Sequence, residues 1–414
     1  MPPHPNTPSR VASIMLSWHA LELISCKTLQ TLWAGYGQIC AITARATTDK
    51  AAQHLADLCG VGPGVAGSTY PLILKLISPP QNSSSTQDEG HFRKMLSYEV
   101  EQYFYSDVVP LLGDGIAVAQ CLASTRGVTG EREFEGLMAT IMVDLRPGFP
   151  VSGGKRSALE RVQVFGALDW LAGFHARSRE VLPGGLDGYV LPPLEESERR
   201  RNADRDAGGG LWLNGGYTYL ATRRKEYASL VEDSDSEWSE AFCSVPEGSS
   251  LSIAEMAALF LTPCGRPNES YIHGDVKSEN LFTTTKGDKV AFFDFQYVGL
   301  GLGVCDLAKL FTCSVPLHML IPDNETLPEE LTMRDGEKQL LERYRSNLLR
   351  EESDRYEWEI FKRHWETALV DWCRFQASWG FWGNTEWLEA RVRSILSDQG
   401  WRDWLHQETS SRAS

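Results

Sequence analysis

The pattern of apolar and polar positions separates a strand-rich first third of the chain from a helix-rich remainder. Apolar runs bounded by turn residues predict strands over residues 38–46, 70–77 and 136–145. Apolar residues at helical spacing predict helices over residues 12–24, 91–105 and 159–175. A longer helix is predicted near the end of the chain, where five large side chains share one stripe: Trp358, Phe361, Trp365, Leu369 and Trp372.

This order of elements predicts an α+β fold with two lobes, a small sheet-rich N-terminal lobe and a larger, mainly helical C-terminal lobe. We expect an N-terminal extension with a helix at residues 1–30, the N-terminal lobe at 31–143, the C-terminal lobe at 144–405 and a flexible tail at 406–414. Polar, charged or turn-rich stretches at residues 79–90, 195–210 and 232–240 are predicted to be solvated loops.

Composition narrows the possible partners and compartments. The 414 residues carry a net charge of −15, which disfavours binding to nucleic acid or to an anionic membrane surface. No stretch approaches the roughly 20 apolar residues of a membrane span, and the N-terminus lacks the features of a signal peptide. Nine dispersed cysteines without a C-x-x-C pair are typical of reduced thiols. We therefore expect a cytoplasmic protein with no nucleic-acid or membrane partner, in an oligomeric state that the sequence leaves open.

The segment YIHGDVKSENLFTTTKGDKVAFFDFQ, residues 271–296, carries the candidate chemistry. Asp275 follows a short apolar strand, and four residues separate it from Asn280. The apolar runs at 281–282 and 290–293 flank the turn TTTKGD and predict a hairpin. Because a hairpin brings its two ends together, Asn280 before the first strand is expected to lie near Asp294 after the second.

These side chains are suited to phosphoryl transfer. The carbonyl oxygen of Asn280 and the carboxylate of Asp294 are hard ligands of the kind that Mg²⁺ prefers. Asp275 lies one loop away and could accept a proton from a substrate hydroxyl. Phosphoryl transfer requires a group that orients the attacking hydroxyl and metal ions that neutralise the triphosphate. A merely polar loop is the alternative, but the combined spacing of His-Gly-Asp, Asn280 and Asp294 is uncommon.

HGDVKSENLF and FFDFQ resemble the catalytic and metal-binding loops of the aminoglycoside phosphotransferase and choline-kinase-like superfamily. The ending Asp-Phe-Gln, followed by GLGVCDLAKLF, most resembles its ecdysteroid-kinase-like branch. The resemblance implies a protein-kinase-like fold, ATP as phosphate donor, Asp275 as catalytic base, and Mg²⁺ held by Asn280 and Asp294.

The same resemblance assigns supporting roles around the catalytic loop. It implies that Asp306, in VCDLA, braces the loop and that His273 supports it by hydrogen bonding. Lys277 corresponds to a protein-kinase position that contacts the γ-phosphate, although an exposed lysine without a role is nearly as good an interpretation.

The N-terminal lobe should supply the rest of the nucleotide site. Lys75 lies inside the apolar strand 70–77, where a buried charge needs a partner or a ligand. The family pattern implies that this partner is Glu101, with Glu99 as the alternative. The end of strand 136–145 is expected to contact adenine through its backbone, at three residues: Met142, Val143 and Asp144.

Two glycine-containing segments could cover the phosphates. Gly35 and Gly37 lie directly before strand 38–46, whereas four glycines are spread over residues 60–67. Glycine lets backbone N–H groups approach a phosphate closely. We favour Gly35 and Gly37, because the strand that follows them leads back to the Lys75 strand. Residues 47–68 are then an insertion.

We therefore predict an ATP-dependent, Mg²⁺-dependent kinase acting on a hydroxyl of a small-molecule metabolite. Aromatic residues near Gly380 and Gly383 could line the acceptor pocket, although the earlier tryptophan stripe is better explained as core. A protein kinase is disfavoured because no Ala-Pro-Glu motif follows Asp294. A non-catalytic nucleotide-binding scaffold is disfavoured because Asp275, Asn280 and Lys75 are all present.

Overall fold

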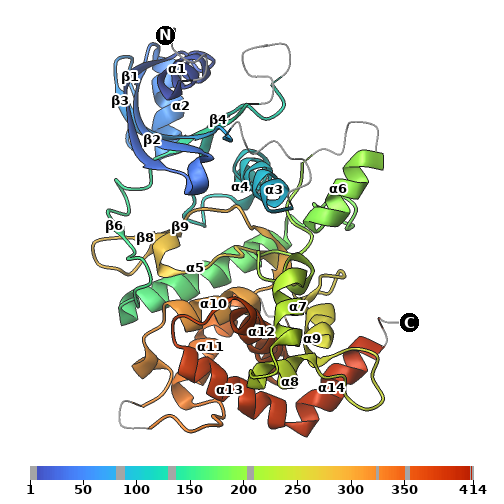
Figure 1. The fold of residues 1–414 in the computed structure, drawn as a ribbon. Coiled ribbons are helices and arrows are strands. Elements are labelled where there is room, and N and C mark those ends of the chain that lie inside the picture. The colour runs from blue at the N-terminus through green and yellow to red at the C-terminus, as the bar shows by residue number, and fades with distance from the viewer. Residues whose placement is uncertain are drawn as a thin grey trace. The chain divides into compact units, whose positions relative to one another are not determined.

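A computed structural model describes residues 7–80, 89–128, 137–202, 209–322, 326–349, 355–410 and 412. The chain divides into two compact units, Met1–Gly148 and Phe149–Ser414. The first contains a five-stranded antiparallel sheet, and the second is mainly helical (Figure 1). The predicted α+β class, with a sheet-rich N-terminal part and a helical C-terminal part, is confirmed.

Apart from two short turns, the elements of the N-terminal unit follow one another in the order helix, two strands, helix, strand, two helices, two strands. They are α1 (Pro8–Ser17), β1 (Leu21–Thr31), the 3-10 turn η1 (Trp33–Gly35), β2 (Gly37–Ala46), α2 (Asp49–Cys59), β3 (Thr69–Ile77), α3 (Glu89–Tyr103), the π-helical turn η3 (Phe104–Val108), α4 (Val109–Leu112), β4 (Cys121–Ser124) and β5 (Met138–Val143).

The sheet has the strand order β1-β2-β3-β5-β4, so β3 lies at its centre. Successive side chains of a strand point to opposite faces. Leu74 and Leu76 pack into the core formed with α1 and α2, whereas Ile77 packs with Tyr98 of α3 on the other face. Lys75 alternates with Leu74 and Leu76, so it shares the face that α3 covers.

The structure corrects two expectations for the start of the chain. The predicted helix 12–24 is wrong at its end, because α1 ends at Ser17 and β1 begins at Leu21. Leu21 is buried and Leu23 is partly buried, whereas Glu22 and Ile24 are exposed, and this strand alternation overlaps the helical stripe. The predicted separate extension at 1–30 is therefore wrong for residues 21–30, because β1 pairs with β2 and forms the edge of the sheet.

The predicted insertion at residues 47–68 folds into a helix of its own. The hydroxyl of Thr48 accepts a hydrogen bond from the Ala51 N–H and caps the start of α2. Gly60, in the left-handed conformation, ends it. Ala52, Leu55 and Ala56 of α2 are buried in the core of the unit, so the insertion covers one face of the sheet.

The C-terminal unit contains most of the helices. Its elements are β6 (Val151–Ser152), α5 (Arg161–Arg179), α6 (Pro193–Asn202), η5 (Leu220–Thr222), α7 (Arg224–Glu232), α8 (Glu237–Cys243), α9 (Ile253–Leu261), β7 (Glu269–Ile272), η6 (Ser278–Asn280), β8 (Leu281–Thr283), β9 (Val290–Phe292), β10 (Gly299–Leu302), α10 (Val304–Cys313), η7 (Leu317–Met319), α11 (Asp335–Leu348), α12 (Trp358–Trp379), α13 (Thr385–Ser397) and α14 (Gln399–Ser410).

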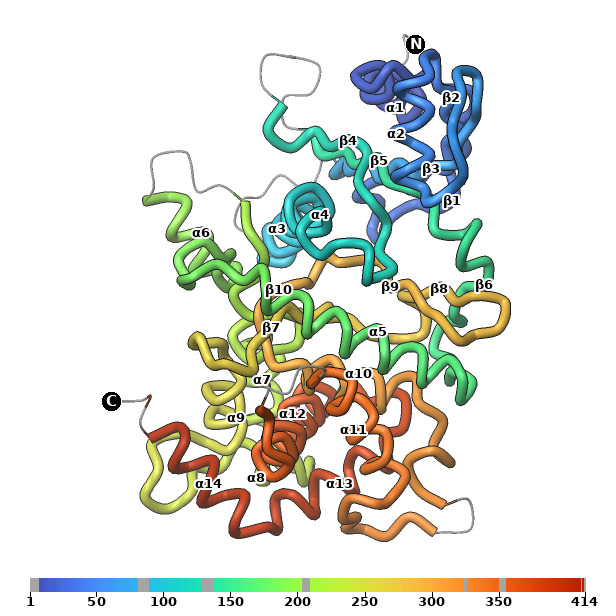
Figure 2. The backbone as a smooth tube through the Cα atoms, turned by 180° about the vertical axis from the view of Figure 1, so that it is seen from behind, coloured from blue at the N-terminus to red at the C-terminus, as the bar shows by residue number. Residues whose placement is uncertain are grey.

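Helix α12 is the central helix of this unit and contacts α7, α8, α9, α10 and α13 (Figure 2). Phe361, Trp365, Leu369 and Trp372 of the predicted stripe are buried, which confirms their assignment to the core. Only Trp358, at the start of the helix, is partly exposed.

One charged stretch that was predicted to be a loop forms a helix over part of its length. The predicted loop at 195–210 is wrong over its first half, because α6 continues to Asn202. Glu196 is fully buried and forms ion pairs with Arg199 and Arg200, one turn further along the helix. Opposite charges at this spacing stabilise a helix, so the charge run belongs to a helix rather than a loop.

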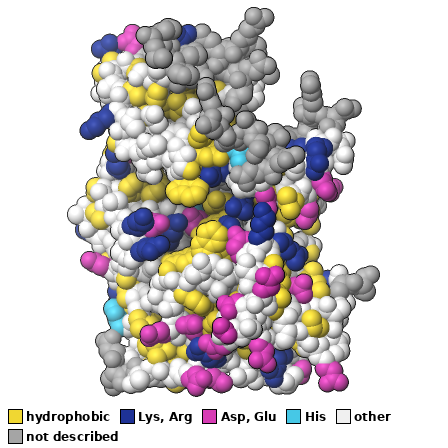
Figure 3. Space-filling view, in the orientation of Figure 1, with side chains coloured by type: hydrophobic (Ala, Val, Ile, Leu, Met, Phe, Trp, Pro, Cys, Tyr) yellow, Lys and Arg dark blue, Asp and Glu magenta, His cyan; other side chains and the backbone are white. Residues whose placement is uncertain are grey.

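The end of the chain also differs from expectation. The predicted tail at 406–414 is helical through Ser410, and residues 411, 413 and 414 lie outside the described part. Residues 81–88 of the predicted loop 79–90 and residues 203–208 of loop 195–210 lie outside it as well. Within the described residues, no helix has the length and apolar character needed to cross a bilayer. Acidic and basic side chains are interspersed across the face drawn in Figure 3.

Candidate functional site

The predicted hairpin forms and joins the two segments that carry the candidate metal ligands. Strands β8 and β9 pair, with Leu281 opposite Phe292. Beyond this pair, the N–H of Phe293 donates to the Asn280 carbonyl at 3.0 Å. Asn280 and Asp294 therefore lie at the same end of the hairpin, as the sequence predicts.

The side chains of Asn280 and Asp294 present hard oxygen atoms. The Asn280 Nδ2 donates to both the carbonyl and the Oδ2 of Asp275, each at 2.9 Å. This use of Nδ2 leaves the amide oxygen as the Asn280 atom suited to a cation. Asp294 has a left-handed backbone (φ 67°), and its Oδ1 accepts a hydrogen bond from Gln296 at 2.7 Å.

This pair of residues fits a magnesium ion that is partly held by phosphate. Mg²⁺ is commonly bound by one or two protein oxygens together with water and substrate phosphates. Among the described residues, no group of three or more His, Cys, Asp or Glu side chains could hold a metal ion. A left-handed backbone at a non-glycine residue costs about 1–2 kcal/mol, and Asp is among the residues that tolerate it best.

Asp275 is paired with a cation on its own loop. The Nζ of Lys277 lies 3.0 Å from Asp275 Oδ2 and 3.3 Å from Glu279 Oε1. Burial alone would lower the pKa of Lys277, but these two carboxylates raise the pKa above its ordinary value. Lys277 therefore remains protonated next to Asp275, where a positive charge could meet a phosphate oxygen.

Asp306 holds the backbone of the loop that precedes Asp275. Its carboxylate accepts hydrogen bonds from the N–H groups of His273 (2.7 Å) and Gly274 (2.9 Å). The Nε2 of His175 lies 3.2 Å from the same carboxylate. Burial alone would raise the pKa of Asp306, but His175 and other nearby basic groups lower it, so Asp306 is ionised. These contacts are consistent with the bracing role that the family resemblance implies for Asp306.

His273 links the two halves of the site. Its Nδ1 accepts from the N–H of Asp275 at 3.2 Å, and its Nε2 lies 3.0 Å from the carbonyl of Phe293. Complete burial lowers the pKa of His273, although surrounding carboxylates oppose the shift. The neutral ring with its proton on Nε2 satisfies both contacts and fixes Asp275 relative to the residue before Asp294.

Lys309 of α10 also holds the catalytic loop, and sequence reasoning missed it. Its Nζ donates to the Gly274 carbonyl at 2.6 Å, and the residue is only 5% exposed. The sequence did contain a signal for this role, because a lysine among the apolar residues of VCDLAKLF needs a buried partner. Lys309 is therefore a positioning residue for Asp275.

For the phosphoryl transfer that the sequence predicts, we expect Lys309→Met to lower the rate without weakening nucleotide binding. Losing the bond to Gly274 releases the residue next to Asp275, and a small misplacement of a reacting group can cost about 10²-fold in rate. Steady-state kinetics and calorimetric ATP binding would measure the two effects separately. Lys338→Met, which removes a half-exposed lysine of α11, is the matched control and should change neither. A parallel fall in ATP affinity would contradict the assignment.

In the N-terminal unit, Lys75 and Glu101 form a buried ion pair. Of the two carboxylates considered, the structure thus selects Glu101 rather than Glu99. The ring of Tyr98 lies 5.6 Å from the Lys75 Nζ. Lys75, Glu101 and Met142 line the same small hollow of this unit.

The remaining residues expected at adenine lie at the end of β5. Val143 pairs with Leu72 of β3, and Asp144 follows directly. The carboxylate of Asp144 forms an ion pair with Arg146, whose Nη2 lies 2.6 Å from the Asp144 Oδ2. Only the backbone of Asp144 is therefore suited to a nucleotide contact, in keeping with the predicted recognition through main-chain groups.

The structure distinguishes the two glycine segments by their distance from Lys75. Gly35 and Gly37 form the turn between β1 and β2, and Gly37 pairs with Ile77, two residues from Lys75. Glycines 60–67 precede β3 at its opposite end, and the six residue-to-residue steps from Thr69 to Lys75 span about 20 Å. A Cβ on Gly37 would lie 2.1 Å from the Leu76 carbonyl, so the close strand pairing requires glycine there.

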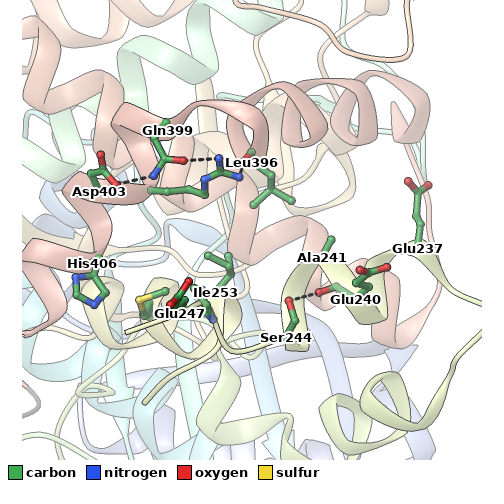
Figure 4. A pocket seen from close by; sticks show the side chains of 13 residues that line it. Glu237, Glu240, Ala241, Ser244, Glu247, Ile253, Leu396, Gln399, Asp403 and His406 are labelled. Atoms are coloured by element: carbon green, nitrogen blue, oxygen red, sulfur yellow. Dashed lines mark hydrogen bonds between the residues drawn. The ribbon is translucent and has the colours of Figure 1, made fainter. Parts of the chain in front are cut away.

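A cavity of the C-terminal unit lies away from these residues. It measures about 890 Å³ and is lined by residues of α8, α9, α13 and α14 (Figure 4). Four acidic side chains line it, and Glu237 among them is paired with Arg393 at 2.6 Å. None of the predicted site residues lies in its lining.

Comparisons with known proteins match part of the chain to one family. Residues 251–345 match the model of the phosphotransferase enzyme family, a segment that contains Asp275, Asn280, Asp294 and Asp306. A comparison with curated protein sequences gave no match.

Solved structures of several phosphotransferases are distantly similar. An aminoglycoside 2'-phosphotransferase in complex with GDP has 12% identity and a TM-score of 0.43, covering 99% of each chain. The macrolide 2'-phosphotransferase of Brachybacterium faecium has 12% identity and a TM-score of 0.37, covering 94% of this chain and 98% of that one. An ethanolamine kinase of Plasmodium vivax has 13% identity and a TM-score of 0.38, covering 92% and 84%. Similarity at this level does not establish a shared function.

Proposed function

We propose that this protein is an ATP-dependent kinase that phosphorylates a hydroxyl group of a small molecule. The observation that carries this proposal is the arrangement of Asp275, Asn280 and Asp294 around one hairpin end. It is supported by the match of that same segment to a phosphotransferase family. The left-handed backbone of Asp294 also supports the proposal, because residues with a strained backbone cluster at functional sites.

Each of these three residues has a defined task in the proposed reaction. Asp275 orients the acceptor hydroxyl and takes its proton, while Asn280 and Asp294 would hold Mg²⁺. The ion would supply charge neutralisation for the triphosphate. The acceptor oxygen forms a bond to the γ-phosphorus, the bond from that phosphorus to the β,γ-bridging oxygen breaks, and ADP leaves with the electron pair.

Residues of the N-terminal unit would bind the nucleotide. Glu101 keeps Lys75 extended from the centre of the sheet, where its ammonium group could meet a phosphate. The turn at Gly35 and Gly37 would cover the phosphates, and the backbone of residues 142–144 would contact adenine. We further propose an ecdysteroid-kinase-like relationship, on the basis of Asp-Phe-Gln at 294–296, and a cytoplasmic location.

A screen of hydroxylated metabolites with Mg²⁺ and ATP tests the proposal. We expect at least one small molecule to gain the mass of a phosphoryl group in the presence of the protein, and the product to be absent with Asp275→Asn. Phosphorylation of proteins alone would favour the protein-kinase alternative. ATP binding with no phosphorylated product in either class would favour a non-catalytic scaffold.

A further inference from the structure

A short segment that follows β6, here called the GGKR loop (residues 153–156), packs directly on the residues that lead into β8. The Gly153 N–H donates to the Leu281 carbonyl at 3.0 Å. The Ser278 Oγ donates to the Gly154 carbonyl at 2.8 Å. A Cβ placed on Gly153 would lie 1.8 Å from the Ser278 carbonyl oxygen, so this close approach requires glycine. The first half of the GGKR loop is therefore fixed to η6 and to the start of β8.

The end of the GGKR loop presents a backbone N–H to Glu279. The Arg156 N–H donates to Glu279 Oε2 at 3.1 Å. Arg156 has a left-handed backbone, with a φ of 53°, and this conformation costs free energy in a residue other than glycine. Residues strained in this way persist where the surrounding structure fixes them, and they cluster at functional sites. The backbone of Arg156 therefore points to a role for the Glu279 carboxylate that it holds.

The second oxygen of Glu279 faces Lys277. The Lys277 Nζ lies 3.3 Å from Glu279 Oε1 and 3.0 Å from Asp275 Oδ2, so two carboxylates hold the ammonium group. An ammonium group has three N–H donors. Two of them are directed at these carboxylates, and among the described residues the third remains for an acceptor outside the protein. The Lys277 side chain is 28% exposed, so a ligand can reach it.

Resting on the kinase function proposed above, we propose that Glu279, anchored by the Arg156 backbone, is a positioning residue that holds the Lys277 ammonium group toward the γ-phosphate of ATP. The four-carbon stem of a lysine is flexible, and ordering such a side chain during binding lowers the affinity for the ligand. The contact with Glu279 orders Lys277 before the nucleotide arrives. Glu279 therefore acts on the reaction through Lys277 and does not itself touch the nucleotide or the acceptor.

Calorimetric binding of ADP and of AMP-PNP, a non-hydrolysable ATP analogue, tests the inference in the presence of Mg²⁺. The two ligands differ by the γ-phosphate, so the ratio of their dissociation constants reports contacts to that group. Lys277→Met should weaken AMP-PNP binding about tenfold or more, the usual contribution of a hydrogen bond to a charged group, and should change ADP binding much less. This variant measures what the Lys277 contact contributes.

Two substitutions of Arg156 separate the effect of its backbone from that of its side chain. Arg156→Val should turn the N–H away from Glu279, because a β-branched residue resists the left-handed conformation. Arg156→Gly loses the same guanidinium group but adopts this conformation readily. We expect the valine variant to bind AMP-PNP about threefold to tenfold more weakly than the glycine variant, the cost of ordering one long side chain. The two variants should bind ADP equally.

Glu279→Asp tests the carboxylate itself. The shorter side chain keeps the negative charge but cannot reach from the Arg156 N–H to the Lys277 Nζ, so its effect cannot arise from a change of charge near the phosphates. We expect AMP-PNP binding to weaken about threefold to tenfold, with little change for ADP. Glu342→Asp, at a half-exposed glutamate of α11, is the matched control and should change neither affinity. Thermal unfolding checks that each variant folds.

The wild-type affinities separate this inference from the proposed function. Three results would each overturn the inference and leave the kinase function intact: equal AMP-PNP affinity in Arg156→Val and Arg156→Gly, wild-type AMP-PNP affinity in Glu279→Asp, or no effect of Lys277→Met. Failure of the wild-type protein to bind either nucleotide with Mg²⁺ would overturn both. If Arg156→Val does not fold, Glu279→Asp decides, because it leaves the GGKR loop unchanged.

Discussion

Asp275→Asn is expected to reduce phosphoryl transfer about 10²- to 10⁴-fold, the usual contribution of a positioned general base. The amide has nearly the shape of the carboxylate, so the contacts of the neighbouring Asn280 and His273 largely persist. ATP binding should be retained, because Asp275 acts on the acceptor hydroxyl. Initial rates with a phosphorylated product as readout, together with calorimetric ATP binding, measure both effects.

Asp288→Asn is the matched control for this change. Asp288 lies on the same hairpin, in the exposed turn that joins β8 to β9, where it bonds to Thr284 at 2.7 Å. The substitution is chemically identical but lies at the opposite end of the two strands, so the rate should stay at the wild-type value. Equal rates for wild type and Asp275→Asn would show that Asp275 is not the base.

Asp294→Asn is expected to have the second-largest effect on the rate of phosphoryl transfer, because it weakens the binding of Mg²⁺. Asn tolerates the left-handed backbone as Asp does, so the hairpin end should keep its shape while losing a negative charge. A metal ion contributes several kcal/mol of charge stabilisation in such reactions, and we expect the rate at fixed Mg²⁺ to fall by about 10²-fold or more. Titration of turnover with Mg²⁺ should show a higher half-saturating concentration.

Binding of Mn²⁺ gives a readout of the same change that does not depend on turnover. Followed by electron paramagnetic resonance in the presence of a non-hydrolysable ATP analogue, it should weaken in Asp294→Asn and remain unchanged in Asp288→Asn. Wild-type affinity for Mn²⁺ in the Asp294→Asn variant would show that Asp294 is not a metal ligand.

Local spacing made much of this site predictable from sequence. A hairpin with clear turn residues fixes which side chains meet at its ends, so the proximity of Asn280 and Asp294 followed from the strand pattern alone. Lys75 was recognisable because a charge inside an apolar strand needs a partner. The choice between Glu99 and Glu101 needed the structure, because only the packing of α3 on the sheet decides which side chain reaches Lys75.

Features that depend on contacts between distant segments were not predictable. The ring of Tyr217 contacts those of Tyr297 and Phe375, and no local pattern connects these three positions. Lys309 was visible as a charge in an apolar helix, but its partner, the Gly274 carbonyl, lies 35 residues earlier. Helix α6 was missed because its arginines were interpreted as solvated, whereas Arg199 and Arg200 pair with the buried Glu196.

The central claim is that the protein transfers the γ-phosphoryl group of ATP to an alcohol. ATP labelled with ¹⁸O at the three non-bridging γ-oxygens, incubated with the wild-type protein and the metabolite set, tests it most directly by mass spectrometry. Our account predicts a phosphorylated alcohol that carries all three labelled oxygens and retains its own hydroxyl oxygen as the bridge. Release of labelled inorganic phosphate with no labelled alcohol in any fraction would contradict it.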